Sequence, residues 1–260
     1  MRRAIASLAP GLVAVCAVAG ADAPGDRRSF VACPIVRDTS TVPCWLAEYQ
    51  GELYFLTLQT DVSAPVNPPW LGHRVLVEGV VSDEPAICGG RVLKPLALSV
   101  LPELDASCNT LLPAEDRYNL GFEPPRPPGP SRGRLAFGDP ASRASELPRA
   151  VTLQYEFDGM VAFRHAQKLQ QLLDAARATQ ASELRITGYR SASRLSDGSV
   201  MRERATIGRE RAQQVEELLR GAGLEGVRFT LRTVDRSKKP DGVGDAAQRR
   251  VDVEIVGAPH

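Results

Sequence analysis

The chain has 260 residues, of which 43% are hydrophobic and 24% are charged, and its formal net charge is +1. This length accommodates two modest domains, each with a core of its own. The composition is that of an ordinary soluble globular protein. Even the more basic half of the chain, residues 149–257, has a net charge of only +4, which is too weak to argue for nucleic-acid binding.

The N-terminal residues have the pattern of a secretory signal. Arg2 and Arg3 precede an apolar run at 4–19, and small residues close the run around Ala21. A membrane anchor is the alternative, but the run is shorter than the roughly 20 apolar residues that span a bilayer. The sequence therefore predicts a signal peptide at 1–21 and a periplasmic mature protein.

Two further features of the N-terminal region bear on the membrane. Cys16 follows Val15, whereas a lipidated cysteine normally follows glycine, alanine or serine, so lipidation is not expected. A second apolar run is absent from the sequence, so we expect no transmembrane segment in the mature chain.

Four cysteines remain after the signal peptide: Cys33, Cys44, Cys88 and Cys108. An even number in an exported protein predicts two disulfides. Sequence cannot choose among the three possible pairings; Cys33–Cys44 with Cys88–Cys108 is our choice because both loops are short. Zinc ligation is the alternative, but closely spaced cysteine pairs and nearby histidines are lacking, so we predict no metal site and no cofactor.

A proline-rich stretch, EPPRPPGP at 123–130, divides the chain. Proline fixes φ and removes an amide donor, so this stretch predicts an extended, semi-rigid linker, which we place at 123–148. Residues 24–122 carry a net charge of −5 and residues 149–257 one of +4. Two explanations of this charge difference stay open: two independent domains with solvated surfaces, or an anionic partner that binds the basic half. Nucleic acid is not expected as that partner, because the basic half has no stripe of aromatic and basic residues.

The first half, residues 30–122, reads as a small all-β domain. A hairpin is expected at 43–60 with its turn at 49–52. A strand at 74–82 contains Gly79, which indicates a bulge, and a strand at 91–101 contains Pro95, which indicates an edge in that part. Such short strands predict a small disulfide-bonded barrel or sandwich, and an OB-like barrel is our choice between them. We expect this domain to serve as a protein-contact or spacer module.

The second half, residues 149–257, alternates strands and helices. Period-2 and period-3.6 patterns predict strands at 151–157, 184–188, 227–234 and 250–256, and helices at 161–178 and 200–220. The predicted order is βαβαββ, a sheet with helices on one face, so the whole chain belongs to the α+β class.

Four fragments of this half occur in a characteristic order: FDG at 157–159, ITGY at 186–189, GRERAQQV at 208–215 and QRRVDVEI at 248–255. In order and spacing they resemble the OmpA-like domain family, over residues 149–257. The resemblance implies non-covalent binding of peptidoglycan in the bacterial periplasm, through the diaminopimelate of the stem peptide.

The resemblance also implies the binding residues. A ligand with carboxylates and ammonium groups needs an arginine that forks onto a carboxylate and an acid that pairs with an ammonium. The family's arginine falls at Arg211, one position before the buried stripe of the predicted helix, so its head could reach the edge of a pocket; a solvated helix arginine is the alternative. The implied peptidoglycan-binding residues are Arg211, Tyr189, Arg190, Ser191, Arg204 and Asp197.

The acid of the family's pattern is missing. Its turn reads Gly-His/Tyr-Thr-Asp, and here Ser191 stands where the acid should be. Serine accepts a hydrogen bond but supplies no charge. Asp197 and Glu203 are the candidates to replace the acid, and alanine substitution of each should then weaken retention on peptidoglycan.

Residues for catalysis are not recognisable. His73 and His165 have no matching nucleophile, and a lone histidine is more often structural or solvated. The sequence therefore predicts a non-enzymatic envelope protein that binds peptidoglycan. The alternative is an interaction module that has kept the fold, lost diaminopimelate binding, and serves an envelope assembly through another envelope protein.

Overall fold

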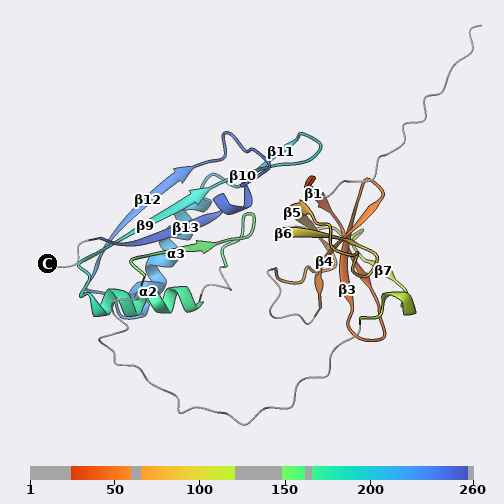
Figure 1. Cartoon of the computed structure of the whole chain (residues 1–260). Coiled ribbons are helices and arrows are strands. Elements are labelled where there is room, and N and C mark those ends of the chain that lie inside the picture. Colours follow the sequence, from red (N-terminus) through yellow and green to blue (C-terminus); the bar gives the residue numbers. More distant parts are fainter. Residues whose placement is uncertain (1–24, 60–65, 121–147, 162–165, 257–260) are drawn as a thin grey trace, which may run out of the picture.

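The computed structural model describes residues 25–59, 66–120, 148–161 and 166–256. The predicted signal peptide, nearly all of the predicted linker, and His165 lie outside these residues. Two units are seen side by side, an all-β N-terminal unit and a mixed C-terminal unit (Figure 1). Among the described residues, no helix is long and apolar enough to cross a membrane.

The N-terminal unit is one curved sheet with the strand order β1-β5-β6-β4-β3-β2-β7. β1 lies at one edge of this sheet and β2 lies near the other edge, but only Cys33 separates them in the chain. The sheet must therefore curl to bring β1 and β2 together. The inner face holds Phe30, Leu56, Val75 and Val77, all nearly inaccessible to solvent. The strands are β1 Arg27–Ala32, β2 Pro34–Arg37, β3 Cys44–Tyr49, β4 Glu52–Leu58, β5 His73–Val81, β6 Arg91–Leu104 and β7 Thr110–Leu112.

The local predictions for these strands are confirmed. β3 and β4 form the expected hairpin, with Gln50 and Gly51 both at positive φ (54° and 82°), as a tight two-residue turn requires. The register of β5 against β6 shifts between Gly79 and Val81, which is the expected bulge. β4 pairs with β6 only at Arg91 and Val92, so Pro95 lies where β6 has a partner on one side alone.

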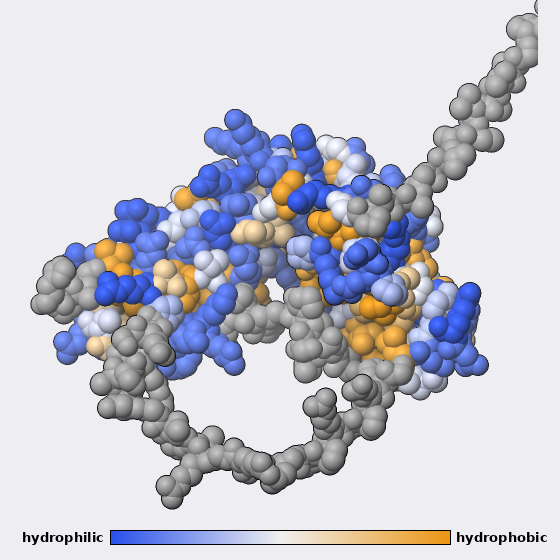
Figure 2. Space-filling model, viewed as in Figure 1, coloured by the Kyte–Doolittle hydropathy of each residue, from blue (hydrophilic) through white to orange (hydrophobic). Residues whose placement is uncertain are grey.

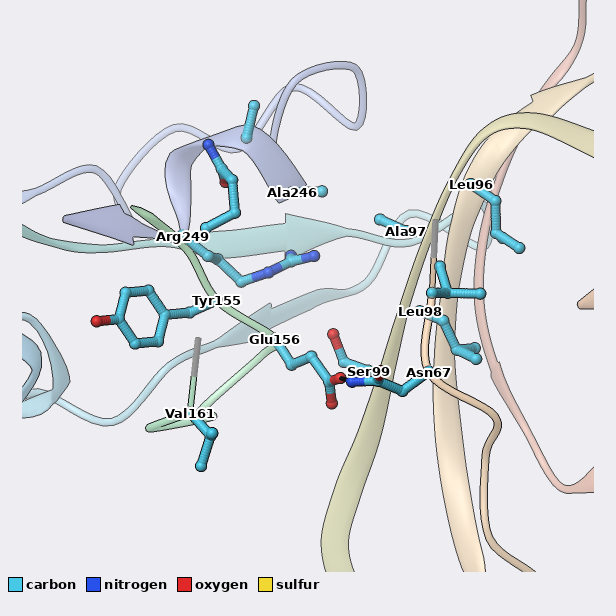
Figure 3. A pocket seen from close by; sticks show the side chains of 13 residues that line it. Asn67, Leu96, Ala97, Leu98, Ser99, Tyr155, Glu156, Val161, Ala246 and Arg249 are labelled. Atoms are coloured by element: carbon cyan, nitrogen blue, oxygen red, sulfur yellow. Dashed lines mark hydrogen bonds between the residues drawn. The ribbon is translucent and has the colours of Figure 1, made fainter. Parts of the chain in front are cut away.

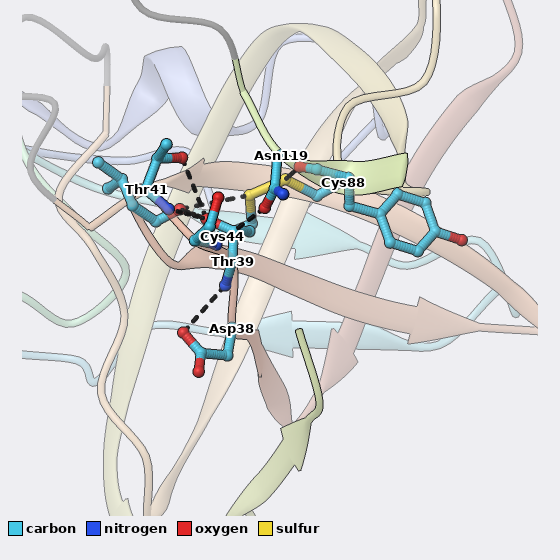
Figure 4. Close-up of a disulfide and its surroundings, with 9 residues drawn as sticks. Asp38, Thr39, Thr41, Cys44, Cys88 and Asn119 are labelled. Carbon is cyan, nitrogen blue, oxygen red and sulfur yellow. Dashed lines mark hydrogen bonds between the residues drawn. A yellow bond between two sulfur atoms is a disulfide. The ribbon is translucent and has the colours of Figure 1, made fainter. Parts of the chain in front are cut away.

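The predicted disulfide pairing is wrong, although all four cysteines are oxidised. Cys33 joins Cys108, and Cys44 joins Cys88 (Figure 4). The parallel pair β2–β7 places Ile35 opposite Thr110, so two residues earlier Cys33 meets Cys108. Non-local strand register, rather than loop length, therefore selects the pairing.

The C-terminal unit is a four-stranded sheet in the order β12-β9-β13-β8. β12 runs parallel to β9, and β13 runs antiparallel between β9 and β8. Helices α2 and α3 pack against one face, where Leu153, Leu172, Ile186 and Val215 are buried (Figure 1). The elements are β8 Ala150–Gln154, α2 Ala166–Ala178, β9 Glu183–Arg190, β10 Ala192–Arg194, β11 Val200–Arg202, α3 Ile207–Gly221, β12 Arg228–Asp235, the 3-10 turn Ala246–Gln248 and β13 Arg250–Val256.

The predicted start of the second helix is wrong. Residues 192–202 form a hairpin of β10 and β11, and α3 begins only at Ile207. Gly198, at a φ of +87°, lies in the turn between the two strands. The Leu195 amide donates to the Ser199 carbonyl and closes this turn. The strand-forming residues Val200 and Met201 therefore pair in the hairpin instead of joining the helix.

Two glycines set the distance between α3 and the sheet. A Cβ built on Gly188 of β9 would lie 1.8 Å from the carbonyl oxygen of Gly208, in the first turn of α3. The obstacle is backbone, which cannot rotate away. The helix therefore starts in direct contact with the strand that leads into the predicted binding turn.

Substituting Gly188→Ala should destabilise the protein by about 3 kcal/mol or more, because the methyl group forces α3 away from β9. The measurement is the free energy of unfolding from urea titration. Gly221→Ala is the matched control: it lies at the end of α3 with open space around it, so its stability should stay within about 1 kcal/mol of wild type. Equal effects of the two substitutions would contradict the packing argument.

Candidate functional site

Arg211 lies on the buried face of α3. Ile207, Arg211 and Val215 follow at intervals of four residues, so all three face the sheet. We expected the Arg211 side chain to reach the edge of a pocket; instead it is completely buried. A guanidinium in such a position must be fully hydrogen-bonded.

All five N–H donors of Arg211 are engaged within the protein. Nε donates to the Gly159 carbonyl at 2.9 Å, and Nη2 donates to the Glu156 carbonyl at 2.9 Å. Nη1 donates to the Tyr189 carbonyl at 3.4 Å. The two remaining bonds go to the Glu203 carboxylate, at 2.7 and 3.3 Å. The guanidinium also lies over the ring of Tyr155, 4.8 Å from its centre.

The Glu203 carboxylate is equally enclosed. Besides the two bonds from Arg211, it accepts the backbone amides of Asp158 at 3.0 Å and of Ser191 at 2.8 Å. Neither charged side chain has any surface open to solvent. We call this group of contacts the Arg211–Glu203 centre.

Ser191 and Arg190 support the centre from beside it. The Ser191 amide binds Glu203, and its hydroxyl donates to the carbonyls of Ala192 and Asp245. Arg190 donates to the Glu203 carbonyl at 2.8 Å and to Asp235 at 3.2 Å.

The other predicted site residues do not place their side chains at the centre. The Tyr189 ring lies under the guanidinium of Arg250 at 4.2 Å, and burial, followed by its bond to Asp252, raises the pKa of Tyr189. Arg204 pairs with Glu210 at 2.8 Å on the surface. Asp197 is exposed in the β10–β11 turn, where bonds from Ser199 lower its pKa.

The loop after β8 is the part of the centre that sequence reasoning missed. Its carbonyls at Glu156 and Gly159 and its amide at Asp158 complete the coordination of the ion pair. Asp158 has a φ of +51° and Gly159 follows it. The pair Asp158-Gly159 was recognisable in the sequence as a turn, but not as a turn that binds the buried ion pair. The alternating apolar residues continuing to Tyr155 and Phe157, both buried, were the available signal that this turn stays in the core.

One cluster has the spacing of a metal site. Cys33, Asp105 and Cys108 bring their potential ligand atoms within 4.8 Å of one another. The two sulfurs are joined to each other, and a metal would need them as thiolates. The cluster therefore offers no metal-binding chemistry in the oxidised protein.

Comparison with known proteins gives a partial likeness of fold. No protein-family model matches the chain, and no curated protein matches it. Three solved structures resemble it: the OmpA-like domain of FopA1 from Francisella tularensis, the cell wall anchor of the T6SS from Pseudomonas aeruginosa, and a MotB-like protein from Desulfovibrio vulgaris.

The extent of that likeness is similar in the three cases. Sequence identities are 12%, 21% and 19%, and each TM-score is 0.32. The matches cover 43%, 42% and 43% of this chain and 75%, 80% and 76% of the respective structures. Less than half of this chain is thus shared with any of these three.

Substituting Glu203→Ala should destabilise the protein by about 3–5 kcal/mol, because it leaves the Arg211 guanidinium buried without its counter-charge. The free energy of unfolding measures this. Glu210→Ala is the matched control, since it also removes a glutamate paired with an arginine, but at the surface, where we expect a loss of about 1 kcal/mol or less. A Glu203→Ala loss no larger than that of Glu210→Ala would contradict the burial of the pair.

Tyr155 predicts a decline of stability in alkali. Burial raises the pKa of Tyr155 from 10.0 to about 12, against the opposing effect of Arg211. The unfolded chain then loses this proton first, so stability is unaffected below pH 10 and falls as the pH rises towards 12. Tyr155→Phe should remove about 1.4 kcal/mol of the loss between pH 8 and pH 11, as measured by urea unfolding at both values. Identical pH profiles for the two proteins would contradict the raised pKa.

Proposed function

We propose that this protein is a non-enzymatic module of the bacterial cell envelope whose OmpA-like C-terminal domain serves protein–protein interaction rather than capture of a peptidoglycan stem peptide. The interleaved strands and helices, with β13 between β9 and β8, support the OmpA-like assignment of residues 149–257. The strand pairings of the N-terminal unit, closed through Cys33, support an OB-like barrel.

The occupation of Arg211 by Glu203 carries this proposal. A stem-peptide carboxylate would need the guanidinium fork, and both of its terminal nitrogens already bind the Glu203 carboxylate. Two backbone amides hold that carboxylate as well. In effect the protein's own glutamate occupies the place of an anionic ligand.

The compartment follows from the cysteines and the N-terminal sequence. Two disulfides persist in an oxidising environment, which for a bacterial protein means outside the cytoplasm. The signal-like residues 1–21 support export to the periplasm. Another envelope protein is then the partner that we propose.

Peptidoglycan binding is the second candidate, and one observation favours it. The arrangement around Arg211 holds a carboxylate in a two-bond fork with two amide donors, which is the chemistry that a stem-peptide carboxylate needs. This candidate requires Glu203 to leave the centre, with Asp158 and Ser191 amides turning to the ligand instead.

Sedimentation with purified, diaminopimelate-containing peptidoglycan tests the proposal. We expect the wild-type mature protein to stay in the supernatant, because its guanidinium is not available. The comparison is a double variant, Glu203→Leu with Arg211→Met, in which both buried charges are replaced together by apolar side chains, a change that is often neutral or stabilising. Circular dichroism verifies that it is folded.

Pelleting of the wild type but not of the double variant would contradict the proposal and establish the second candidate. Arg220→Ala with Glu216→Ala is the matched control, because it also removes an arginine–glutamate pair without changing the net charge, but at the surface of the same helix. Equal pelleting of all three proteins would point to binding elsewhere on the surface and would leave the Arg211–Glu203 centre closed.

A further inference from the structure

The segments through which the two domains meet include two that surround the Arg211–Glu203 centre. The C-terminal domain contributes the loop at 155–159, the β10–β11 hairpin and Arg249 at the foot of β13. The N-terminal barrel contributes the outward faces of β1, β5 and β6. A cavity of about 340 Å³ lies along this interface, between Leu98 and Ser99 on one side and Glu156 and Arg249 on the other (Figure 3).

A buried ion pair is the polar centre of the interface. Both terminal nitrogens of Arg249 bind the Glu78 carboxylate, one of them at 3.2 Å, and Arg249 also donates to the Ser193 hydroxyl at 2.9 Å. Arg249 is 1% exposed and Glu78 9% exposed. Separation of the domains would break these hydrogen bonds but would let water solvate both charges, so the pair orients the docked arrangement more than it stabilises it.

The loop at 155–159 makes its own contacts with the barrel. The Phe157 amide donates to the Ser99 hydroxyl at 2.8 Å, and the Glu156 carboxylate accepts from the Asn67 side chain at 3.2 Å (Figure 3). The Phe157 ring packs in one apolar cluster with Leu76 and Leu101 of the barrel. The loop is thereby held from the barrel side.

The β10–β11 hairpin is held in the same way. The Ser196 amide donates to the Ser29 carbonyl at 2.7 Å, and the Ser29 amide donates to the Ser196 hydroxyl at 2.9 Å. Leu195 and Met201 of the hairpin join the apolar cluster with Val31 of the barrel. Figure 2 shows polar and apolar residues adjoining where the two units meet.

These contacts and the contacts of the centre share their backbone. Within the loop, Glu156 binds the barrel with its side chain and Arg211 with its carbonyl. Of the next two residues, Phe157 donates its amide to the barrel and Asp158 donates its amide to Glu203. The hairpin begins next to Ser191, which donates to Glu203, and ends at Arg202, next to Glu203.

We propose that the N-terminal barrel is an intramolecular latch that keeps Glu203 seated on Arg211, so that undocking of the barrel opens the centre to a carboxylate ligand. This inference rests on the proposed function, in which Glu203 occupies the site, and adds that the docked barrel keeps the site closed. Each domain has a core of its own, so the interface can separate without unfolding either one. Because coupling between two sites is reciprocal, a carboxylate that displaced Glu203 would in turn loosen the barrel.

Native-state amide exchange of the full chain, followed by NMR, tests the latch. Glu78→Arg places a like charge against Arg249 and, since Glu78 faces away from the barrel core, leaves that core intact. The Ser196 and Phe157 amides, which bond across the interface, report undocking. The Ser191 amide reports the centre, because the bonds of Ser191 are to Glu203, Ala192 and Asp245, all in its own domain.

We expect exchange at Ser196, Phe157 and Ser191 to accelerate about tenfold or more in Glu78→Arg, while Ile186 and Val253, paired in the middle of the sheet, keep the wild-type rate. Glu84→Arg is the matched control: it makes the same charge change at an exposed position paired with Lys94, and all these rates should stay unchanged.

Faster exchange at Ser196 and Phe157 without any change at Ser191 would overturn the latch. If Glu78→Arg alone leaves the interface amides protected, Leu76→Asp is added, since Leu76 lies in the apolar cluster of the interface; an interface still protected in the double variant also overturns it. Pelleting of the wild type but not of the Glu203→Leu, Arg211→Met double variant would contradict the proposed function and leave these exchange rates as an independent result.

Discussion

The burial of the Arg211 guanidinium is the constraint on which the C-terminal domain depends. A charge in the core is tolerated only when a counter-charge and hydrogen-bond acceptors surround it, since the cost of leaving it bare is several kcal/mol. Three segments far apart in sequence supply those acceptors: the loop at 155–159, the end of β9 at Tyr189, and Glu203 before α3. Their positions are therefore fixed together, and the close approach of Gly188 to Gly208 holds α3 at the depth where the arginine reaches all of them.

The same arrangement decides what the site can bind. A free carboxylate competes with a glutamate tethered four residues before α3, and a tethered group acts at a far higher effective concentration than a dissolved ligand. The amides of Asp158 and Ser191 add to this advantage because they already point at the tethered carboxylate. The groups that could bind a carboxylate are thus present, but the protein's own Glu203 occupies them. This favours a partner that binds the surface of the domain.

The sequence predicted the strands and helices better than it predicted the contacts between residues far apart in the chain. Strand alternation and helical stripes are local, so β9, β12 and β13 lie where the pattern indicated. The Cys33–Cys108 pairing depends on the register of β2 against β7, which no local pattern encodes. Arg211 was expected at a pocket edge because it lies one position before the buried stripe of its helix. Its burial is explained only by acceptors from distant segments. Glu203 was one of two candidate acids. The strand β11, which was predicted as the start of the helix, separates it from Asp197 in the turn of the hairpin.

The domain interface has the balance that a reversible contact needs. Its apolar part is a modest cluster around Leu76, Leu101 and Phe157, smaller than the core of either domain. Its polar part centres on the Arg249–Glu78 pair, which fixes how the domains align more than it adds to the affinity between them. Contacts of this kind define one docked arrangement while keeping the cost of separation low. The loop at 155–159 and the hairpin belong both to this interface and to the Arg211–Glu203 centre. A partner that competed for the same face of the N-terminal unit would therefore act on the Arg211–Glu203 pair without touching it.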